Sequence, residues 1–375
     1  MIIVSDENIP GVESMFGDYG DLRFIPGRSI TKMDLLNADV LLVRTLCEVN
    51  RQLVEGTPVK FVGSMTSGTD HIDTNYLSSR DIEFAHAPGC NAMAVVQYDF
   101  SVFASLRPDW KELQIGILGC GNVGLSLYKI LKRIGAKVRV FDPFLTNHDV
   151  SELVEFSEVL KSDILCIHTP LTYDGSHPTA KLLNHSQIST IRSGTLLINA
   201  GRGGVIDNAA LLNRLIGQND LLVALDVWEG EPDINLSLFS QVSLATPHIA
   251  GYTWEAKMRA TGMVRNAFLS WSGISCPSAD IFEKSEGHLD SIVDESTLND
   301  AILACYDVAS DDKVFRNKVT SSLAVGVTFD SIRNTYPARH EFNYYSVDAG
   351  HKLAEDLSKL GFSMANYNQA LNRDR

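Results

Sequence analysis

The stretch Gln114-Ile-Gly-Ile-Leu-Gly-Cys-Gly-Asn-Val-Gly124 decides the fold of this chain. Its first half is a short apolar run that predicts a buried strand, and its second half has the glycine spacing GxGxxG. Residues 125–134 carry apolar side chains at helical spacing and stop at Gly135, a common helix end. A second apolar run, 137–141, then ends at Asp142. The stretch therefore predicts a strand, a glycine turn, a helix and a second strand.

This arrangement is typical of a turn that binds a dinucleotide. Its first glycine permits the tight turn, its second lets the backbone approach a pyrophosphate, and its third lets helix and strand pack closely. The N-terminus of the following helix attracts the anion. We therefore expect a cofactor to contact the turn residues Gly119, Gly121, Asn122, Val123 and Gly124.

Asp142 predicts which dinucleotide binds. It follows Gly124 at roughly the 20-residue spacing at which an acid accepts hydrogen bonds from the ribose hydroxyls. Pro143 comes next, and no Arg or Lys is adjacent. A 2′-phosphate would meet an unscreened carboxylate there, so the sequence predicts NAD rather than NADP.

Composition excludes several functional classes. The chain has 375 residues, enough for two or three domains, and a net charge of −14 with no basic tract. This charge disfavours nonspecific binding to nucleic acid or to an anionic membrane. The N-terminus lacks the pattern of a signal peptide, and no apolar run approaches the ~18 residues of a membrane span. Six cysteines without CxxC spacing predict reduced thiols, a cytoplasmic location and no metal site.

The remaining pattern predicts an α/β protein. Residues 1–91 and 92–250 each alternate strands with helices, which implies two Rossmann-like, doubly wound parallel sheets. Residues from about 251 to 281 are expected to complete the first domain. Residues 282–375 have their own mixed pattern and predict a small α+β domain. The expected strands are 2–4, 40–43, 61–63, 164–167, 196–198, 222–225 and 344–347, and the expected C-terminal helices are 298–307 and 351–360.

Two loops of the first domain follow strand ends, where open α/β sheets place ligands. Arg44 and Thr45 follow the strand 40–43, and Thr66, Ser67 and Gly68 follow the strand 61–63. Hydroxyl groups, amides and a guanidinium in these loops could hold a small anionic molecule. The alternative is two ordinary loops, one with a turn glycine.

Four strands of the second domain deliver polar residues to one edge of the predicted sheet. Arg202 lies between glycines, where a guanidinium can engage a carboxylate bidentately. His248 is a natural proton carrier near neutral pH, and Glu231 can hold its tautomer and favour its protonated form. A hydride acceptor, a base, its orienting acid and a carboxylate clamp together suit the oxidation of a 2-hydroxy acid. Isolated histidines are more often structural, and this interpretation covers His71, His86, His148, His177 and His185, while His168 is interpreted as a strand-end residue.

Four motifs resemble the D-isomer-specific 2-hydroxyacid dehydrogenase family: GCGNVG, NAGRGGVID, LDVWEGEP and TPHIAGYT. The resemblance covers roughly residues 1–275. It implies that Arg202 binds the substrate carboxylate, that His248 is the acid/base and that Glu231 is its partner. It also implies that Asp226 is the acid near the nicotinamide and that Thr169 and Gly251 contact the cofactor.

Further segments resemble a narrower branch of this family, whose members act on a phosphorylated 2-hydroxy acid and dimerise through an additional C-terminal domain. They include Asp6-Glu-Asn8, Gly68-Thr-Asp-His71 and Phe329-Asp330…Ile332-Arg333. The resemblance implies a homodimer through residues 282–375. It also implies substrate contacts from Arg44, Thr45, Thr66, Ser67, Gly68 and Tyr252. Two departures stand out: the connector 106–110 is short, and Thr45 replaces a serine but keeps the hydroxyl.

Two alternatives remain open on the sequence alone. One is a related dehydrogenase that acts on 3-phosphoglycerate or glyoxylate, which the C-terminal segment argues against. The other is a non-catalytic, NAD-sensing protein similar to a corepressor on the same fold, since such proteins can keep the Arg, Glu and His set. Turnover of a hydroxy acid separates these possibilities.

Overall fold

A computed structural model describes residues 1–275, 287–288, 297–348 and 353–365 of the chain. It divides into two compact units, each described here by itself. The first comprises residues 1–91 and 253–284, and the second comprises residues 92–252 and 285–375. Cys276, residues 276–281 of the predicted first domain and residues 351–352 of a predicted helix lie outside the described residues.

The first unit is built on a parallel sheet of five strands in the order β2-β1-β3-β4-β5. Its strands are β1 (Ile2–Asp6), β2 (Asp21–Ile25), β3 (Val40–Val43), β4 (Phe61–Ser64) and β5 (Glu83–Ala85). Its helices are α1 (Val12–Phe16), α2 (Arg51–Val54), α3 (Thr74–Ser79) and α10 (Trp254–Ser272), with short 3-10 turns at Gly17–Tyr19, Gly27–Ser29 and Lys32–Leu35.

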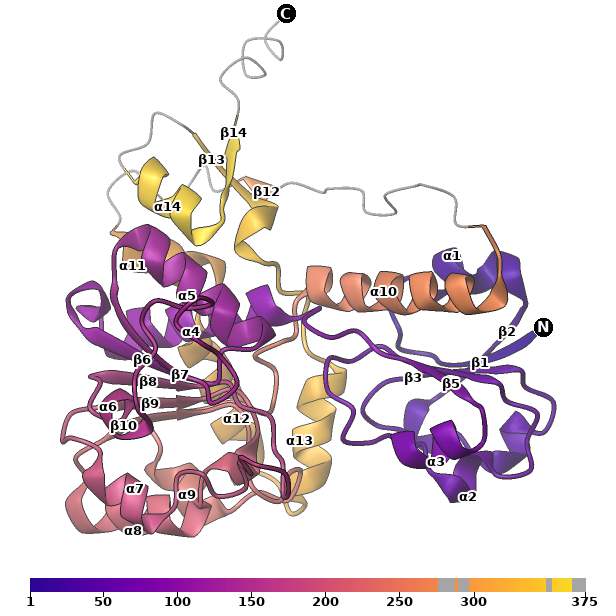
Figure 1. Ribbon diagram of the computed structural model, residues 1–375, viewed down its shortest axis with the longest axis horizontal. Helices are drawn as coiled ribbons and strands as arrows, with labels where there is room; N and C mark the ends of the chain where they lie inside the picture. Colours follow the sequence, from indigo (N-terminus) through magenta and orange to yellow (C-terminus); the bar gives the residue numbers. More distant parts are fainter. Residues whose placement is uncertain (276–286, 289–296, 349–352, 366–375) are drawn as a thin grey trace, which may run out of the picture. The chain divides into compact units, whose positions relative to one another are not determined.

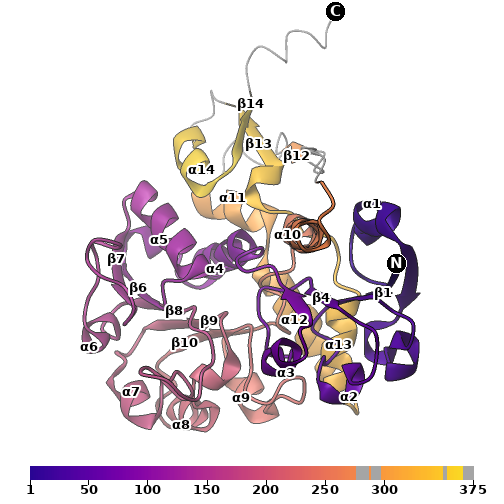
Figure 2. The same ribbon diagram turned by 45° about the vertical axis from the view of Figure 1, so that its right-hand side comes forward.

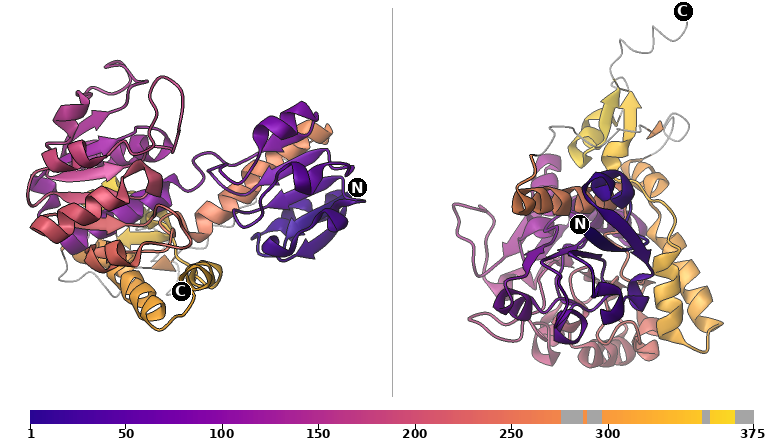
Figure 3. Two further views of the ribbon diagram at one scale, coloured as in Figure 1. Left: turned by 90° about the horizontal axis from the view of Figure 1, so that it is seen from below. Right: turned by 90° about the vertical axis from the view of Figure 1, so that its right-hand side faces the viewer.

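Helix α10 returns from much later in the chain to complete this unit, and Figure 3 shows it lying along the sheet. Its Phe268 ring lies 5.5 Å from Phe16 and 5.5 Å from Phe61, centroid to centroid. A Cβ on Gly63 of β4 would lie 2.5 Å from Val264 of α10. Glycine at that position therefore lets the helix approach the strand, and the expected completion of this fold by residues after 251 has a packing reason.

The second unit contains a parallel sheet of six strands in the order β11-β10-β9-β8-β6-β7. Its strands are β6 (Gln114–Leu118), β7 (Lys137–Phe141), β8 (Ile164–Ile167), β9 (Leu196–Asn199), β10 (Leu222–Leu225) and β11 (Leu244–Ala245). Its helices are α4 (Ala92–Leu106), α5 (Asn122–Ile134), α6 (Phe156–Val159), α7 (His185–Thr190), α8 (Asn208–Gln218) and α9 (Leu236–Gln241), with 3-10 turns at Trp110–Glu112 and Gly203–Val205. Figure 1 shows α4 and α5 on one face of the sheet and α7, α8 and α9 on the other.

Helices on both faces explain why the central strands are uniformly apolar. Every residue of β8 is buried, as parallel strands covered on both sides require. Helix α5 ends where the sequence predicts, because Gly135 adopts the left-handed conformation with φ of 87°. The prediction of two Rossmann-like parallel sheets is confirmed.

The described part of the C-terminal segment shares the core of the second unit. It contains α11 (Leu298–Cys305), α12 (Val308–Thr320), α13 (Val325–Asn334), a 3-10 turn at Phe342–Tyr344 and α14 (Ala354–Leu360), and its small parallel sheet has the order β12-β13-β14. These strands are β12 (Gly287–His288), β13 (Tyr345–Asp348) and β14 (Ser363–Ala365), grouped beside α14 in Figure 2. The sequence analysis located α11, α14 and β13 but missed α12 and α13.

Helix α12 covers the edge strand β11. Asp312 accepts a hydrogen bond of 2.7 Å from the backbone N–H of Ala245, a group that an exposed edge would leave to water. The Phe315 ring packs 5.0 Å from Phe239. The C-terminal segment therefore stabilises the part of the sheet from which the loop 246–252 departs. No helix among the described residues combines the length and the apolar character that a membrane crossing requires.

Candidate active site

The glycine turn after β6 has the geometry that its sequence predicts. Gly119 has a φ of 85°, which favours glycine, and a Cβ on Gly124 would lie 2.0 Å from the carbonyl oxygen of Gly119. A Cβ on Gly121 would enter open space. Protein packing therefore explains the first and third glycines, whereas the second leaves room for a ligand at the N-terminus of α5.

Asp142 lies directly after β7 and is tied to the same turn. Its Oδ2 accepts from the backbone N–H of Cys120 at 2.8 Å, and its Oδ1 accepts from Phe144 at 3.0 Å. The carboxylate therefore fixes the glycine turn as well as lying where an acid can meet a ribose. An ionised carboxylate has about four acceptor sites, so further hydroxyl donors can be accommodated.

Thr169 approaches the glycine turn from the end of β8. A Cβ on Gly119 would lie 2.7 Å from the Thr169 methyl group. The Thr169 hydroxyl is buried, and no described residue provides it with a hydrogen-bond partner. A buried hydroxyl in this position fits a contact with a bound molecule, because such groups are normally satisfied. The turn, Asp142 and Thr169 together fit a dinucleotide.

Arg202 lies in a shaped turn after β9. The Asn199 side chain accepts from the N–H of Gly201 and donates to the carbonyl of Arg202, at 3.1 and 3.0 Å. A Cβ on Gly203 would lie 2.0 Å from the Trp228 carbonyl carbon. The turn that carries Arg202 therefore packs directly against the loop that carries Glu231.

Glu231 and His248 are brought into contact, as the sequence analysis expects. The Nδ1 atom of His248 is hydrogen-bonded to Oε1 of Glu231, while Oε2 accepts from the Trp228 N–H at 3.1 Å. Both side chains remain roughly 30% exposed. His248 has a φ of 57°, a left-handed conformation that is uncommon for a residue with a side chain and recurs at functional sites.

The electrostatics of Glu231 favour its charged form. Burial acts to raise its pKa, but attraction to His248 and hydrogen bonds from His248 and Trp228 outweigh it. The pKa of Glu231 therefore lies below its ordinary value. An ionised Glu231 fixes the proton on Nδ1 of His248 and leaves Nε2 to exchange a proton with another molecule. The pair can therefore perform general acid/base chemistry.

Asp226 lies beneath the loop that carries His248. Its buried carboxylate accepts from the Thr246 hydroxyl at 2.7 Å and from the N–H groups of Ile249 and Ala250 at 2.8 and 3.0 Å. Its own carbonyl accepts from the His248 N–H at 2.7 Å. These bonds explain how the strained backbone of His248 is held, and the expected contact of Asp226 with the cofactor stays a prediction.

The loop after His248 carries Gly251 and Tyr252. The Tyr252 N–H donates to Ile249 at 2.9 Å, which closes the turn that contains Gly251. The Tyr252 ring lies 6.1 Å from Tyr336, and the Arg333 guanidinium lies 5.5 Å above it. Sequence reasoning placed Tyr252 at the site but did not foresee these two C-terminal neighbours.

The substrate-binding residues expected in the first unit lie at the carboxyl ends of its strands. Arg44 follows β3 and forms a bidentate ion pair with buried Asp6 at the end of β1, at 2.8 and 3.2 Å. Thr45 next to it is exposed. The Thr66 hydroxyl donates to the carbonyl of Gly68 at 2.7 Å, and the Ser67 hydroxyl accepts from Gly89. The hydroxyls therefore shape their own loop, and Arg44 has a structural partner that the sequence analysis did not predict.

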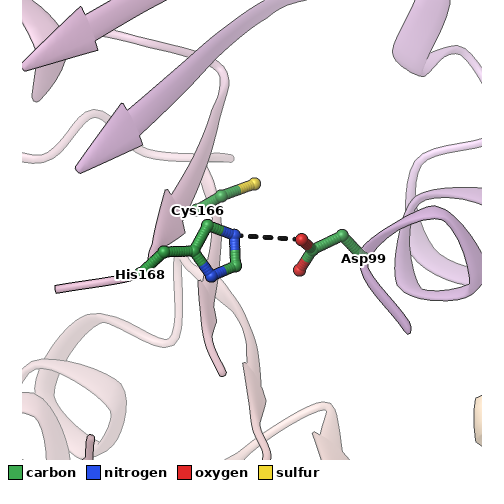
Figure 4. A group of neighbouring side chains, drawn as sticks. All are labelled: Asp99, Cys166 and His168. Atoms are coloured by element: carbon green, nitrogen blue, oxygen red, sulfur yellow. Dashed lines mark ion pairs between the residues drawn. The ribbon is translucent and has the colours of Figure 1, made fainter. Parts of the chain in front are cut away.

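Figure 4 shows a buried cluster that the sequence analysis also missed. His168 Nε2 lies 3.0 Å from Asp99 Oδ2, and both side chains are almost inaccessible to solvent. The two atoms are close enough to form an ion pair when His168 is protonated. Cys166 has its sulfur within 4.8 Å of the other ligand-type atoms. Burial raises the pKa of Asp99 against the opposing attraction of His168.

The cluster combines side chains that can bind metals, although the sequence analysis predicted no metal. His168 immediately precedes Thr169, so the pair also anchors the end of β8 below the cofactor turn. Asp99 comes from α4, and only the packing of that helix on the sheet brings the acid to the histidine. No local sequence pattern could have signalled the pair.

Family models match two parts of the chain. Residues 97–250 match the NAD-binding domain of the D-isomer specific 2-hydroxyacid dehydrogenases, and residues 281–361 match a domain of unknown function, DUF3410. The second unit therefore contains an NAD-binding domain of that family, which confirms the predicted cofactor.

Solved structures show the same fold. A D-lactate dehydrogenase from Aquifex aeolicus, complexed with NAD and lactic acid, superimposes with a TM-score of 0.62 at 22% identity, covering 73% of this chain and 96% of that one. An NAD-bound 3-phosphoglycerate dehydrogenase of Entamoeba histolytica gives a TM-score of 0.62 at 22% identity, covering 76% of this chain and 99% of that one.

Curated relatives match almost the whole chain, including its C-terminal segment. The erythronate-4-phosphate dehydrogenase of Teredinibacter turnerae is 42% identical over 371 residues, which cover 97% of this chain and 99% of that protein. The enzyme of the same name from Pseudomonas aeruginosa PAO1 is 39% identical, covering 93% of this chain and 96% of that protein. The chain therefore belongs to the erythronate-4-phosphate dehydrogenase family.

Proposed function

We propose that this protein oxidises 4-phospho-D-erythronate to (R)-3-hydroxy-2-oxo-4-phosphooxybutanoate with NAD, as a step in the synthesis of pyridoxal 5′-phosphate. The observation that carries the proposal is the His248–Glu231 pair, placed beside the Arg202 turn in a chain similar over its full length to enzymes of that name. The similarity to dehydrogenases over the full length, C-terminal segment included, supports catalysis rather than a role in sensing NAD alone.

His248 is the base of the oxidation. Its neutral Nε2 takes the proton of the C2 hydroxyl, and ionised Glu231 stabilises the imidazolium that forms. Arg202 holds the substrate carboxylate through its planar guanidinium and so orients C2. Base catalysis of this kind contributes about 10²–10⁴-fold to the rate.

When bound, NAD would supply the hydride acceptor. The glycine turn residues, from Gly119 to Gly124, would hold its pyrophosphate, and Asp142 would hold its adenosine ribose. The open space beside Gly121 and the buried Thr169 hydroxyl support these roles. Asp226 and Gly251 would complete the nicotinamide side of the site.

Arg44, Thr45 and Tyr252 are the proposed contacts of the far part of the substrate, with its phosphate. The amides of the loop Thr66–Gly68 are proposed to hold the carboxylate together with Arg202. The bidentate pair with Asp6 presets the direction of the Arg44 guanidinium, which supports a fixed role in recognition over a mobile one.

The protein is proposed to act as a homodimer through its C-terminal segment and to work in the cytoplasm. The five buried cysteines of the described residues form no disulfide with one another, which supports a reducing compartment. Sedimentation of the full chain tests the dimer, which should have about twice the 41.2 kDa mass of one chain.

Turnover on a panel of acids tests the proposed function. The protein is assayed with NAD and 4-phosphoerythronate or 3-phosphoglycerate, and with NADH and glyoxylate, each with and without a 2-oxo acid that can reoxidise bound NADH. We expect 4-phosphoerythronate to give the highest kcat/KM. Binding of NAD without turnover of any acid would instead favour the sensor.

His248→Asn provides the matched control for that assay. Asparagine keeps a polar side chain but cannot carry the proton, so turnover should disappear while NAD still binds with its wild-type affinity. Near-normal turnover in this variant would refute the assignment of the base. Loss of NAD binding would indicate that the loop has collapsed, which a thermal unfolding curve reveals independently.

A further inference from the structure

A buried arginine of the C-terminal segment contacts the loop that carries His248. Arg339 follows α13 in the chain and is only 6% exposed. Its Nη2 atom donates to the carbonyl of Ala250, two residues after His248, and to the carbonyl of Ala94 on α4 at 3.3 Å. Its guanidinium lies 4.1 Å from the centroid of the Tyr306 ring. The side chain therefore joins the C-terminal segment directly to this loop.

Ala250 is the point at which the loop is held from two directions. Its N–H donates to the carboxylate of Asp226, after β10, at 3.0 Å, and its carbonyl accepts from Arg339. His248 has a left-handed φ of 57°, and such a conformation persists only when the surrounding structure fixes it. Asp226 fixes the loop from the sheet, and Arg339 fixes it from the C-terminal segment.

Arg339 is poorly satisfied for an arginine whose only task is stability. Its Nε and Nη1 atoms are buried, and no described residue forms a hydrogen bond with either of them. Buried donors without partners oppose folding, and the face of the Tyr306 ring compensates the charge only in part. The burial of this guanidinium therefore calls for a reason other than stability.

Arg316 of the same segment is the contrasting case. Its Nη1 and Nη2 atoms donate to the carbonyls of Phe239 and Val242, each at 2.9 Å, and its Nε pairs with Asp312 at 2.8 Å. Its guanidinium also lies 5.0 Å from the centroid of the Phe239 ring. Both arginines thus bind backbone carbonyls and stack on an aromatic ring. Arg316 does so before β11 begins, whereas Arg339 does so after β11 ends.

We propose that Arg339 is a positioning residue for His248 and that it acts through the carbonyl of Ala250. The hydrogen bond fixes the turn that follows His248, and it thereby fixes the direction in which the imidazole leaves the backbone. A displacement of about 1 Å at a reacting group can lower a rate about 100-fold, so catalysis depends on that direction. The segment that matches a domain of unknown function then supports the active site of its own chain. The inference rests on the proposed role of His248 as the base.

Three variants separate this role from ordinary packing. Arg339→Met removes the charge and the donor but keeps a long side chain. Arg339→Lys keeps the charge and can still donate to a carbonyl. Arg316→Met is the matched control, because it removes the same kinds of contact on the other side of β11. Each variant is measured for kcat, KM, affinity for NAD, thermal unfolding and amide hydrogen exchange of residues 246–252.

Arg339→Met should lower kcat by about 10-fold to 100-fold, with a smaller change in the affinity for NAD. Hydrogen exchange should become faster in residues 246–252, because the loop should hold its amide bonds to Asp226 less firmly. Arg339→Lys should recover most of both losses. Arg316→Met should lower the unfolding temperature without changing kcat or the exchange of this loop.

Wild-type kcat and wild-type exchange in Arg339→Met, with only a lower unfolding temperature, would overturn the proposal. A loss of kcat in Arg316→Met as large as that in Arg339→Met would also overturn it, because a general loosening of the protein would then explain both. If Arg339→Met does not fold, Arg339→Gln takes its place, since glutamine loses the charge but keeps a donor, and the same outcomes decide.

Failure of the proposed function would be seen separately, as absence of turnover by the wild type. Hydrogen exchange needs no turnover, so it still tests whether Arg339 holds the loop. Equal exchange of residues 246–252 in the wild type and in Arg339→Met would then contradict the inference.

Discussion

Asp142 gives the sharpest test of how the cofactor site works, because its carboxylate has two separable tasks. It accepts two backbone hydrogen bonds, from Cys120 at 2.8 Å and Phe144 at 3.0 Å, which hold the glycine turn. In its proposed role it also places a negative charge where the 2′-phosphate of NADP would lie. Asp142→Ala removes both tasks, whereas Asp142→Asn removes the charge and keeps one acceptor oxygen.

The magnitudes differ for the two variants. Two unit charges 4 Å apart interact with about 4 kcal/mol at an effective dielectric constant of 20. Asp142 is only partly buried, so solvent reduces this value, and about 1.4 kcal/mol, or tenfold, is a cautious expectation. Each lost backbone hydrogen bond to a charged acceptor costs about 1.5–3 kcal/mol. Alanine should therefore also weaken the turn itself.

The assay is calorimetric titration of each variant with NAD and with NADP, together with thermal unfolding. Asp142→Asn should raise the affinity for NADP relative to NAD about tenfold or more, and it should lower the unfolding temperature less than Asp142→Ala because it keeps one acceptor oxygen. Asp142→Ala should show the same relaxed preference, a weaker affinity for NAD and a lower unfolding temperature. An unchanged preference in a folded Asp142→Asn protein would refute the ribose role.

Three further changes test other parts of the structure. The pKa of Glu231 lies below its ordinary 4.5, so its stabilisation is present above that pH and is lost as the pH falls through the lower folded value. The difference in unfolding free energy between wild type and Glu231→Gln should therefore shrink as urea titrations move from neutral pH to pH values below 4.5. Gly203→Ala should lower the free energy of unfolding by about 1–3 kcal/mol and remove most of the activity, because its Cβ would lie 2.0 Å from the Trp228 backbone. The control Gly204→Ala meets only the Leu171 side chain, at 3.1 Å, and should have a mild effect in the same unfolding and turnover assays. Asp99→Leu should destabilise the protein by about 3 kcal/mol, because His168 is left buried without its partner. The double variant Asp99→Leu with His168→Leu should recover part of that loss. Equal stability of the single and double variants would contradict the ion pair.

The parts of the site that the sequence located are those with a local physical cause. The glycine turn depends on a positive φ at Gly119 and a close approach at Gly124, and both involve residues a few positions apart. Parallel strands bring their carboxyl ends to one edge, so the strand ends 225 and 245 place Glu231 and His248 in the same region. The resemblance of further motifs then indicated which branch of the dehydrogenase family the chain is similar to, the one that acts on a phosphorylated 2-hydroxy acid.

The tertiary structure alone decided which charges meet across elements that are far apart in the chain. Asp6 joins Arg44, Asp99 joins His168, and Arg333 lies over the Tyr252 ring only because helices and strands pack in one arrangement. Periodicity shows which face of a helix is buried, but not which acid on that face meets which base. The sequence by itself therefore determined the two parallel sheets, the glycine turn and the predicted catalytic pair. Packing determined the electrostatic environment of that pair.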